Sequence, residues 1–279
     1  MKLLIIGGSV FDRIVSEEKI EESAGGIYHS ALKMLEVKNT IDILSLCTQI
    51  SSKTYKYFKK IFEQCDEKYF DEVENIPTVT LEESLSGYRK ETYSDLATPL
   101  NFDQIDFEKF DGILINVITG KELDYNILRE IRNQTKALIY FDVHSLSRLS
   151  SSIGERKFCL IPEFELWAES IDIIQANEYE LVSLFNIADE ISVAQKLFSL
   201  GVKVLIVTKS EKGAKVYFKD EDEINFYFKS AKKFNGVNTI GCGDYFGSSF
   251  FYNYLITKNH FSALNFAINE VEKTLSNRI

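Results

Sequence analysis

The sequence is poor in cysteine and proline, and this scarcity excludes several classes of protein. Its 279 residues include only four cysteines and three prolines. The cysteines form no CxxC pair and no evident disulfide framework, so a reducing cytoplasm is the simplest expectation. With so few prolines and no low-complexity linker, the chain shows no division into separate units. The cysteines are widely scattered, at Cys47, Cys65, Cys159 and Cys242.

Long apolar runs and an excess of basic residues are also missing. The opening MKLLIIGG has the length of a strand and soon meets Asp12 and Arg13, so it is too short for the core of a signal peptide. No stretch reaches the length of a membrane span. The net charge of −10 argues against binding to a nucleic-acid backbone, although local donors can still hold a small anion. We therefore expect neither a membrane nor a nucleic acid as a partner.

The sequence does contain short apolar runs that alternate with helical patterns. One such pattern lies at 191–200, where Ile191, Ala194 and Leu197 share a helical face. Strands that alternate with helices predict a largely parallel sheet covered on both faces, in a single α/β domain over 1–279. The runs that predict buried strands lie at 3–6, 41–46, 112–117, 137–143, 171–176 and 202–207.

Two segments depart from this alternation. Residues 76–100 are rich in β-branched, aromatic and turn residues and carry no helical stripe. This pattern predicts short antiparallel strands that project from the main sheet. Residues 216–229 hold two apolar strands around an acidic turn, Asp220 to Glu223, which predicts a β-hairpin.

The stretch NTIGCGDYFGSSFF, residues 238–251, carries the clearest chemistry. A bare loop of Gly241, Cys242 and Gly243 directly precedes Asp244, and aromatic residues then recur at helical spacing. Free N–H groups at a helix N-terminus attract an anion, and a carboxylate at the same end can take a proton from a hydroxyl. Together these parts suit phosphoryl transfer. The alternative is a glycine-rich turn in which Asp244 only caps the helix.

Other phosphate-binding loops fit the sequence less well. No GxxxxGK[ST] occurs, which argues against a Walker A loop. Gly241, Gly243 and Gly247 give GxGxxxG instead of the dinucleotide spacing GxGxxG, and they lie late in the chain. A dinucleotide-dependent oxidoreductase, which the α/β alternation alone would permit, is therefore the weaker hypothesis.

NTIGCGDYFGSSF resembles the signature D-T-x-G-A-G-D-x-F of the ribokinase-like (PfkB) carbohydrate kinases. The resemblance implies that Asp244 is the catalytic base and that Gly241, Cys242 and Gly243 form the anion hole. Cys242 replaces the usual alanine and is still small. Asn238 replaces the usual first aspartate, near the place where some members bind a monovalent cation. This replacement weakens the expectation of such a cation, although the Asn238 carbonyl can still ligate one.

The same resemblance implies a fold and a set of ligands. The fold is a three-layer α/β/α sandwich with a mostly parallel central sheet and a small β lid, here from segments near 11–24 and 76–100. The implied ligands are ATP, Mg²⁺ and a small-molecule acceptor. The implied location is the cytoplasm, and a homodimer formed through the lid is a further expectation.

Two motifs near the start resemble the family's acceptor-binding elements. LLIIGGSVFDRI, residues 3–14, resembles the opening strand whose following aspartate binds acceptor hydroxyls, here Asp12. AGGIYHSALKML resembles the di-glycine motif that contacts substrate, here Gly25 and Gly26. His29 and Ser30 stand where the family often has asparagine, and we include His29 among the substrate-binding candidates. The alternatives are a turn aspartate, a helix-entry turn and a polar surface histidine.

Two later motifs follow strand ends. NEYE resembles the family's N-x-x-E motif, so Asn177 and Glu180 are expected to organise metal-bound water around the phosphates, as suits Mg²⁺. The alternative is an Asn cap with acidic residues in the first helical turn. FDVHSLSR resembles the family's D-x-N-x-R strand end, with Asp142 at the strand terminus and His144 at the Asn position.

The nucleotide-binding elements are expected in the last third of the chain. VTKSEKGAKVYF resembles V-T-x-G-x-x-G, which implies that Thr208 and Gly213 bind nucleotide, with Ser210 in place of a glycine. The alternative is an ordinary strand–turn–strand. Asn269 lies on the last predicted helix, which resembles the element that flanks the adenine in relatives, so it is expected to bind nucleotide. The alternative is that this helix only packs against the core.

These motifs occur in the family's order over about residues 3–270 and predict an ATP-dependent kinase that phosphorylates a hydroxyl of a sugar or related small molecule. Phe11, Tyr28 and His29 leave open a nucleoside kinase of the same fold, since they could stack on a base. The departures at Asn238, Ser30 and Ser210 leave open a binding or regulatory protein with weak or no turnover.

Overall fold

The computed structural model describes residues 1–279 except 16–18, 84–88, 95–96, 149–153, 156–157 and 279. Parts of both predicted lid segments therefore lie outside the described residues. Among the described residues, a nine-stranded sheet forms the centre of the molecule. Its order is β14 (Glu223–Lys229), β13 (Ala214–Asp220), β12 (Val204–Thr208), β11 (Ile173–Asn177), β9 (Leu138–Asp142), β8 (Gly112–Asn116), β1 (Lys2–Gly7), β4 (Ile43–Ile50) and β5 (Asp66–Glu72).

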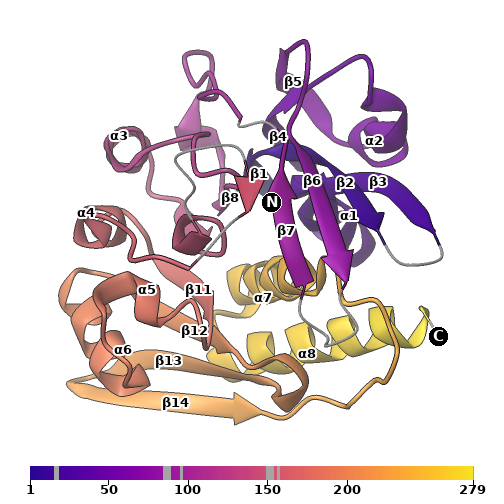
Figure 1. The fold of residues 1–279 in the computed structure, drawn as a ribbon. Coiled ribbons are helices and arrows are strands. Elements are labelled where there is room, and N and C mark those ends of the chain that lie inside the picture. The colour runs from indigo at the N-terminus through magenta and orange to yellow at the C-terminus, as the bar shows by residue number, and fades with distance from the viewer. Residues whose placement is uncertain (16–18, 84–88, 95–96, 149–153, 156–157, 279) are drawn as a thin grey trace.

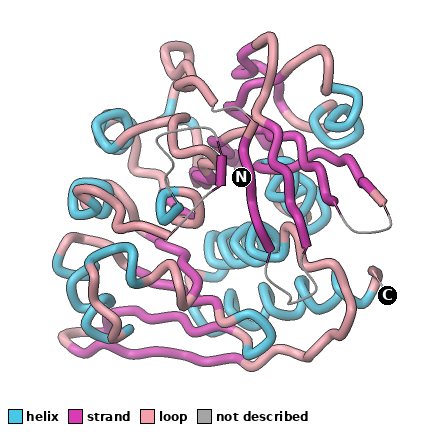
Figure 2. The backbone as a smooth tube through the Cα atoms, viewed as in Figure 1, coloured by secondary structure: helices cyan, strands magenta, loops and turns pink. Residues whose placement is uncertain are grey.

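The strand predictions are confirmed across this sheet. Among the described residues, all pairings from β12 to β5 are parallel. The β12–β13 and β13–β14 pairings are antiparallel. The predicted hairpin is β13–β14, whose two strands run side by side at the bottom of Figure 2. The edge strand β5 was not predicted, because DEKYFDE has too few apolar residues to stand out.

The sheet is buried on both faces, as its continuous apolar strands require. Successive side chains of a strand point to opposite faces. In β1, Leu4 and Ile6 therefore enter one core while Leu3 and Ile5 enter the other.

Two layers of helices cover these faces and complete the predicted three-layer sandwich (Figure 1). One layer contains α3 (Tyr125–Asn133), α4 (Phe164–Ala168), α5 (Val182–Phe185) and α6 (Glu190–Ser199). The other contains α1 (Ile27–Val37), α2 (Tyr55–Phe62), α7 (Cys242–Thr257) and α8 (His260–Ser276). Three short 3-10 turns, η1 (Phe107–Lys109), η2 (Leu146–Arg148) and η3 (Ser210–Lys212), link elements.

In the part of the chain that the structure describes, a second sheet of five strands stands beside the sandwich. Its order is β10 (Gly154–Glu155), β7 (Arg89–Tyr93), β6 (Thr78–Glu83), β2 (Ser9–Val15) and β3 (Ile20–Gly26). The antiparallel pairing of β6 with β7 confirms the prediction for 76–100. The parallel pairing of β2 with β6 and the short strand β10 were not predicted, since both depend on contacts between distant segments.

The topology brings polar side chains to one edge of the main sheet. Parallel strands all end on the same side, where ligands bind in open α/β sheets. Asn116, Asp142, Asn177 and Thr208 are the last residues of β8, β9, β11 and β12. The N-terminus of α7 lies at the same edge, because Asn116 contacts Asp244 in its first turn.

Candidate active site

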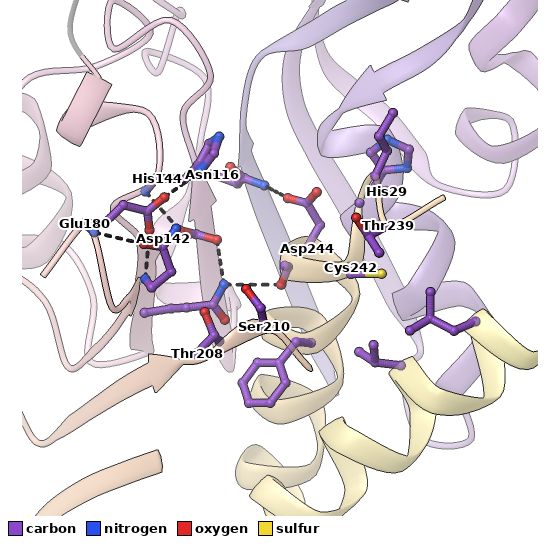
Figure 3. A pocket seen from close by; sticks show the side chains of 18 of the residues that line it. His29, Asn116, Asp142, His144, Glu180, Thr208, Ser210, Thr239, Cys242 and Asp244 are labelled. Carbon is purple, nitrogen blue, oxygen red and sulfur yellow. Dashed lines mark hydrogen bonds and ion pairs between the residues drawn. The ribbon is translucent and has the colours of Figure 1, made fainter. Parts of the chain in front are cut away.

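A cavity of about 580 Å³ opens between this sheet edge, the second sheet and the start of α7. It gathers most of the predicted site residues, although they come from segments far apart in the chain (Figure 3). The predicted residues that line it are Asp12, Gly26, His29, Asn177, Glu180, Thr208, Ser210, Gly213, Gly241, Cys242, Gly243 and Asp244.

Two predicted site residues do not line this cavity. A Cβ at Gly25 would lie 2.3 Å from a carboxylate oxygen of Asp12, so Gly25 gives Asp12 the space it occupies. Asn269 is exposed and lines a smaller neighbouring cavity with Lys232 and Glu272. Its predicted contact with a nucleotide therefore stays a prediction.

The loop before α7 has the bare, amide-rich form that was predicted. Gly241 is the N-cap of α7, with φ of 78°, and a Cβ there would come within 2.8 Å of the His29 ring. Only glycine combines that conformation with that close approach. A Cβ at Gly243 would meet nothing nearer than Gln175 Nε2 at 3.9 Å, so this face of the loop is open.

Asp244 does not cap the helix. The N-cap is Gly241, no side chain among the described residues caps this terminus, and Asp244 lies within the first turn of the helix. Its Oδ1 instead accepts a hydrogen bond from Asn116 Nδ2 (Figure 3). Burial raises the pKa of the Asp244 carboxyl above its ordinary value, while the nearby His29 and His144 and the Asn116 hydrogen bond oppose that rise. The result is a carboxylate more basic than a surface aspartate and directed into the cavity.

Two polar residues within buried strands support this arrangement, and sequence reasoning missed both. One is Asn116, which holds Asp244. The other is Gln175, whose Nε2 donates to Asp142 Oδ2 at 2.7 Å and to the Gly243 carbonyl at 3.2 Å, while its Oε1 accepts from the Tyr140 hydroxyl. Each interrupts an otherwise apolar strand, and such an interruption is the signal that could have identified them.

Asp12 and His29 form a second pair in the cavity. Asp12 is only 5% exposed, and its Oδ2 lies 3.7 Å from His29 Nε2. Neither ring nitrogen of His29 has a hydrogen-bond partner among the described residues. A shielded, unpartnered imidazole facing a cavity contradicts the alternative of a surface histidine, and it suits a hydroxyl-bearing ligand.

A third group joins Asp142, His144 and Glu180. His144 Nδ1 lies 2.9 Å from Glu180 Oε1. Burial disfavours charge on both, but their mutual attraction outweighs it, so the pKa of His144 is raised and that of Glu180 is lowered. Burial and the neighbouring Glu180 raise the pKa of Asp142 to about 7, although His144 partly offsets them. This carboxyl therefore changes charge near neutral pH.

Asn177 and Glu180 fit an indirect role at a metal. Asn177 Oδ1 accepts from the backbone N–H groups of Tyr179 and Glu180, and Glu180 Oε2 accepts from the Asn177 N–H. Asn177 is therefore not the N-cap of a helix, since the N-cap of α5 is Leu181, and its side chain instead closes a turn after β11. Among the described residues no cluster of three His, Cys, Asp or Glu side chains is able to hold a metal ion.

The other end of the cavity presents backbone and apolar groups. Ser210 adopts φ of 51° and Gly213 adopts φ of 111°, which explains why glycine is common at the Ser210 position. The nearby lysines are engaged, since Lys209 pairs with Glu190 and Lys212 with Glu178. Five apolar residues line this end, namely Ala231, Phe234, Ile268, Val271 and Leu275.

Solved structures with a similar fold are numerous. A pyrophosphate-dependent kinase in the ribokinase family, solved as a sulfate complex, shares 18% identity over 98% of this chain and 95% of its own, with a TM-score of 0.83. Arabidopsis thaliana ribokinase, complexed with ribose and ATP, shares 17% identity over 99% and 92%, with a TM-score of 0.77. Thermotoga maritima ribokinase shares 16% identity over 99% and 93%, with a TM-score of 0.75. At these identities the likeness shows the ribokinase fold.

Sequence comparison then identifies the family. Among the curated proteins there is no significant match. Among the described residues, no helix has the length and apolar character needed to span a membrane. The family model described as pfkB family carbohydrate kinase matches residues 78–269, which include the α7 loop, Asp244 and the strand ends that line the cavity. The chain belongs to the pfkB family of carbohydrate kinases.

Proposed function

We propose that this protein is an ATP-dependent kinase that transfers the γ-phosphate to a hydroxyl of a sugar or similar neutral polyol. The observation that best supports this proposal is the position of Asp244. Its carboxylate lies within the first turn of α7, beside the open loop 241–243 and in the same cavity as Asp12 and His29. A base, an anion site and hydroxyl-binding side chains thus share one space.

The chemistry follows from these positions. Asp244 accepts the proton of the attacking hydroxyl, and its raised pKa increases its strength as a base. The N–H groups of Gly241 and Gly243 would face the charge that develops on the transferred group, while the Cys242 N–H donates to the Thr239 carbonyl. Asn116 and Gln175 act as positioning residues, since one holds Asp244 and the other holds the Gly243 carbonyl. Mg²⁺ bound to ATP oxygens would supply further positive charge, with Asn177 and Glu180 holding its water.

The acceptor half of the cavity, around Asp12, His29 and Asp142, favours a neutral polyol. Carboxylates accept hydrogen bonds from several hydroxyls and repel a phosphorylated acceptor. The nucleoside alternative is weakened, because two of the three proposed stacking residues, Phe11 and Tyr28, do not line the cavity, whereas His29 does. Phe11 packs on Tyr57 with ring centroids 4.9 Å apart, and Tyr28 packs against the aromatic rings of α2.

The donor half, formed by loops 208–213 and 239–243 with the inner face of α8, favours a nucleotide. Its backbone amides suit phosphates, and its apolar end suits a purine base. A bare pyrophosphate would leave that apolar end unused, so ATP is the donor we propose although a structural neighbour is a pyrophosphate-dependent kinase.

The second sheet is proposed as a lid. Val79, Leu81 and Tyr93 from β6 and β7 line the cavity, and Glu91 Oε1 pairs with Arg148 Nη1 at 2.8 Å. Closure over an acceptor would exclude water from the transfer. We also propose that two copies associate through this sheet, which sedimentation would check. A cytoplasmic location is proposed because the proposed phosphate donor is ATP.

The test is Mg²⁺-dependent ADP release from ATP with a panel of sugars, cyclitols, nucleosides and sugar phosphates. Asp244→Asn is run beside the wild type, and inorganic pyrophosphate replaces ATP in a parallel series. Stimulation by a neutral polyol, lost in the variant, is the expected result. Turnover with pyrophosphate and none with ATP would reject ATP as the donor. Silence across the panel with ATP binding intact would favour a non-catalytic binding protein.

A further inference from the structure

One side chain outside the cavity holds the anion-hole loop from behind. Arg278 follows α8, and its Nη1 donates to the carbonyl oxygens of Asn238 at 2.6 Å and Ile240 at 3.0 Å. Its Nη2 lies 3.4 Å from the Tyr245 hydroxyl, and its guanidinium carbon lies 5.4 Å from the centroid of that ring. One guanidinium thus joins the loop to the first turn of α7.

These contacts set the direction of the loop's amides. In a trans peptide the carbonyl and the N–H point in opposite directions. Because Arg278 holds the Ile240 carbonyl, the Gly241 N–H of the same peptide points away from Arg278. Arg278 also holds the Asn238 carbonyl, so the Thr239 N–H points away from Arg278 as well. Both Thr239 and Gly241 line the cavity, whereas Arg278 does not. Asn238 Oδ1 adds a hydrogen bond from the Ile240 N–H at 2.9 Å.

One of these two carbonyls, that of Asn238, is the oxygen that was expected to ligate a monovalent cation. Asn238 was expected to offer its carbonyl to such an ion, but that oxygen and the Ile240 oxygen both accept from Arg278 Nη1. An ion in contact with both oxygens would occupy the place of that nitrogen. The residues present therefore do not fit a monovalent cation at these oxygens.

We propose that Arg278 is a built-in cation that replaces a bound monovalent ion behind the anion hole. A guanidinium keeps its charge at every pH that proteins tolerate, so it supplies a permanent positive charge next to the loop. It also fixes the amides that face a phosphate. Arg278 is thus a positioning residue, and the consequence for turnover rests on the proposed function.

The first test needs no variant. Wild-type turnover is measured at constant ionic strength in potassium, sodium and tetramethylammonium buffers, and thermal unfolding is followed in the same three buffers. Equal turnover and equal melting temperature are expected. Activation or stabilisation that is specific to potassium would overturn the proposal.

The second test measures anion binding directly. Arg278→Ala is compared with the wild type and with Lys273→Ala, a matched removal of an exposed cation on α8. Calorimetry with the ATP analogue AMP-PNP and with inorganic pyrophosphate reports the anion hole without turnover. We expect about tenfold weaker binding of both ligands to Arg278→Ala, the loss of one charged hydrogen-bonding group. Added guanidinium or potassium should restore part of the affinity, and Lys273→Ala should bind normally.

The outcomes separate this proposal from the proposed kinase activity. Normal binding of both ligands to Arg278→Ala would overturn the role of Arg278 and leave the kinase intact. Weaker binding without turnover on any acceptor would support Arg278 and remove the kinase. If Arg278→Ala does not fold, Arg278→Lys replaces it. The proposal would be rejected if Arg278→Lys bound both ligands with unchanged affinity and potassium activated the wild type. A wild type that binds neither ligand would overturn both.

Discussion

The donor and acceptor halves of the cavity are built by different means. The donor half presents backbone amides and apolar side chains, and the nearby Lys209 and Lys212 are paired with glutamates. The acceptor half presents ionisable side chains that face one another, with Asp12 beside His29 and Asp142 beside His144. One half acts through main-chain geometry and the other through charge.

This difference explains where the sequence follows the family signature and where it departs. A binding loop made of amides tolerates changes of side chain, so Cys242 and Ser210 can replace the usual small residues. In the acceptor half each side chain is itself the binding group. His29 and His144 at positions where asparagine is usual therefore change what that half can recognise.

The largest effect is expected where the halves meet. Asp244→Asn should lower turnover by at least about a hundredfold because the general base is lost, while ATP binding is retained. Steady-state kinetics with calorimetry measure the two quantities. The control is Asp222→Asn, which removes a fully exposed carboxylate at the tip of the β13–β14 turn. Near-normal turnover in Asp244→Asn would remove this residue from the mechanism.

The next effect should be confined to the donor half. Gly243→Val places a branched side chain where only Gln175 lies within 4 Å, so the protein should fold while the added atoms fill the anion site. We expect ATP binding to weaken by about tenfold or more, as for the loss of at least one charged hydrogen bond. Gly243→Ala should give a smaller loss of the same kind. Equal affinities in all three proteins would mean that the loop is only structural.

A matching change in the acceptor half should leave nucleotide binding in the donor half unchanged. His29→Leu removes an imidazole that has no protein hydrogen-bond partner among the described residues, so folding should be kept. The KM for the acceptor should rise by about tenfold while the affinity for AMP-PNP stays unchanged. A parallel loss of AMP-PNP affinity would show that the two halves are not separable.

The smallest effects should appear as displacements of the pH profile. Asp244 must be ionised to act, so kcat/KM should fall as pH drops through its raised pKa. Asp12→Asn removes a neighbouring negative charge that raises the pKa of Asp244, so the acidic limb should move to lower pH. Asn116→Leu removes the hydrogen bond that stabilises the ionised Asp244 carboxylate, which raises the pKa of Asp244. The acidic limb should therefore move to higher pH. Displacements in the same direction would contradict this electrostatic account.

Much of the fold could be predicted because its signals are local. Apolar runs and helical spacing within short windows predicted the strands, α6, α7 and the β13–β14 hairpin. The loop at Gly241 to Asp244 was equally readable, since glycine freedom and a helix N-terminus are properties of adjacent residues. A stacking role for Phe11 and Tyr28 had been left open, but their rings pack on aromatic residues of α2 and do not line the cavity.

The sequence by itself thus determined the α/β alternation, the family and the identity of the candidate base. Tertiary structure alone decided which side chains surround that base. Asn116 and Asp244 are 128 positions apart, and Arg278 reaches carbonyls 38 and 40 positions before it. Such contacts leave no local pattern, because they arise only when the sheet order brings strand ends, the α7 loop and the end of α8 to one edge.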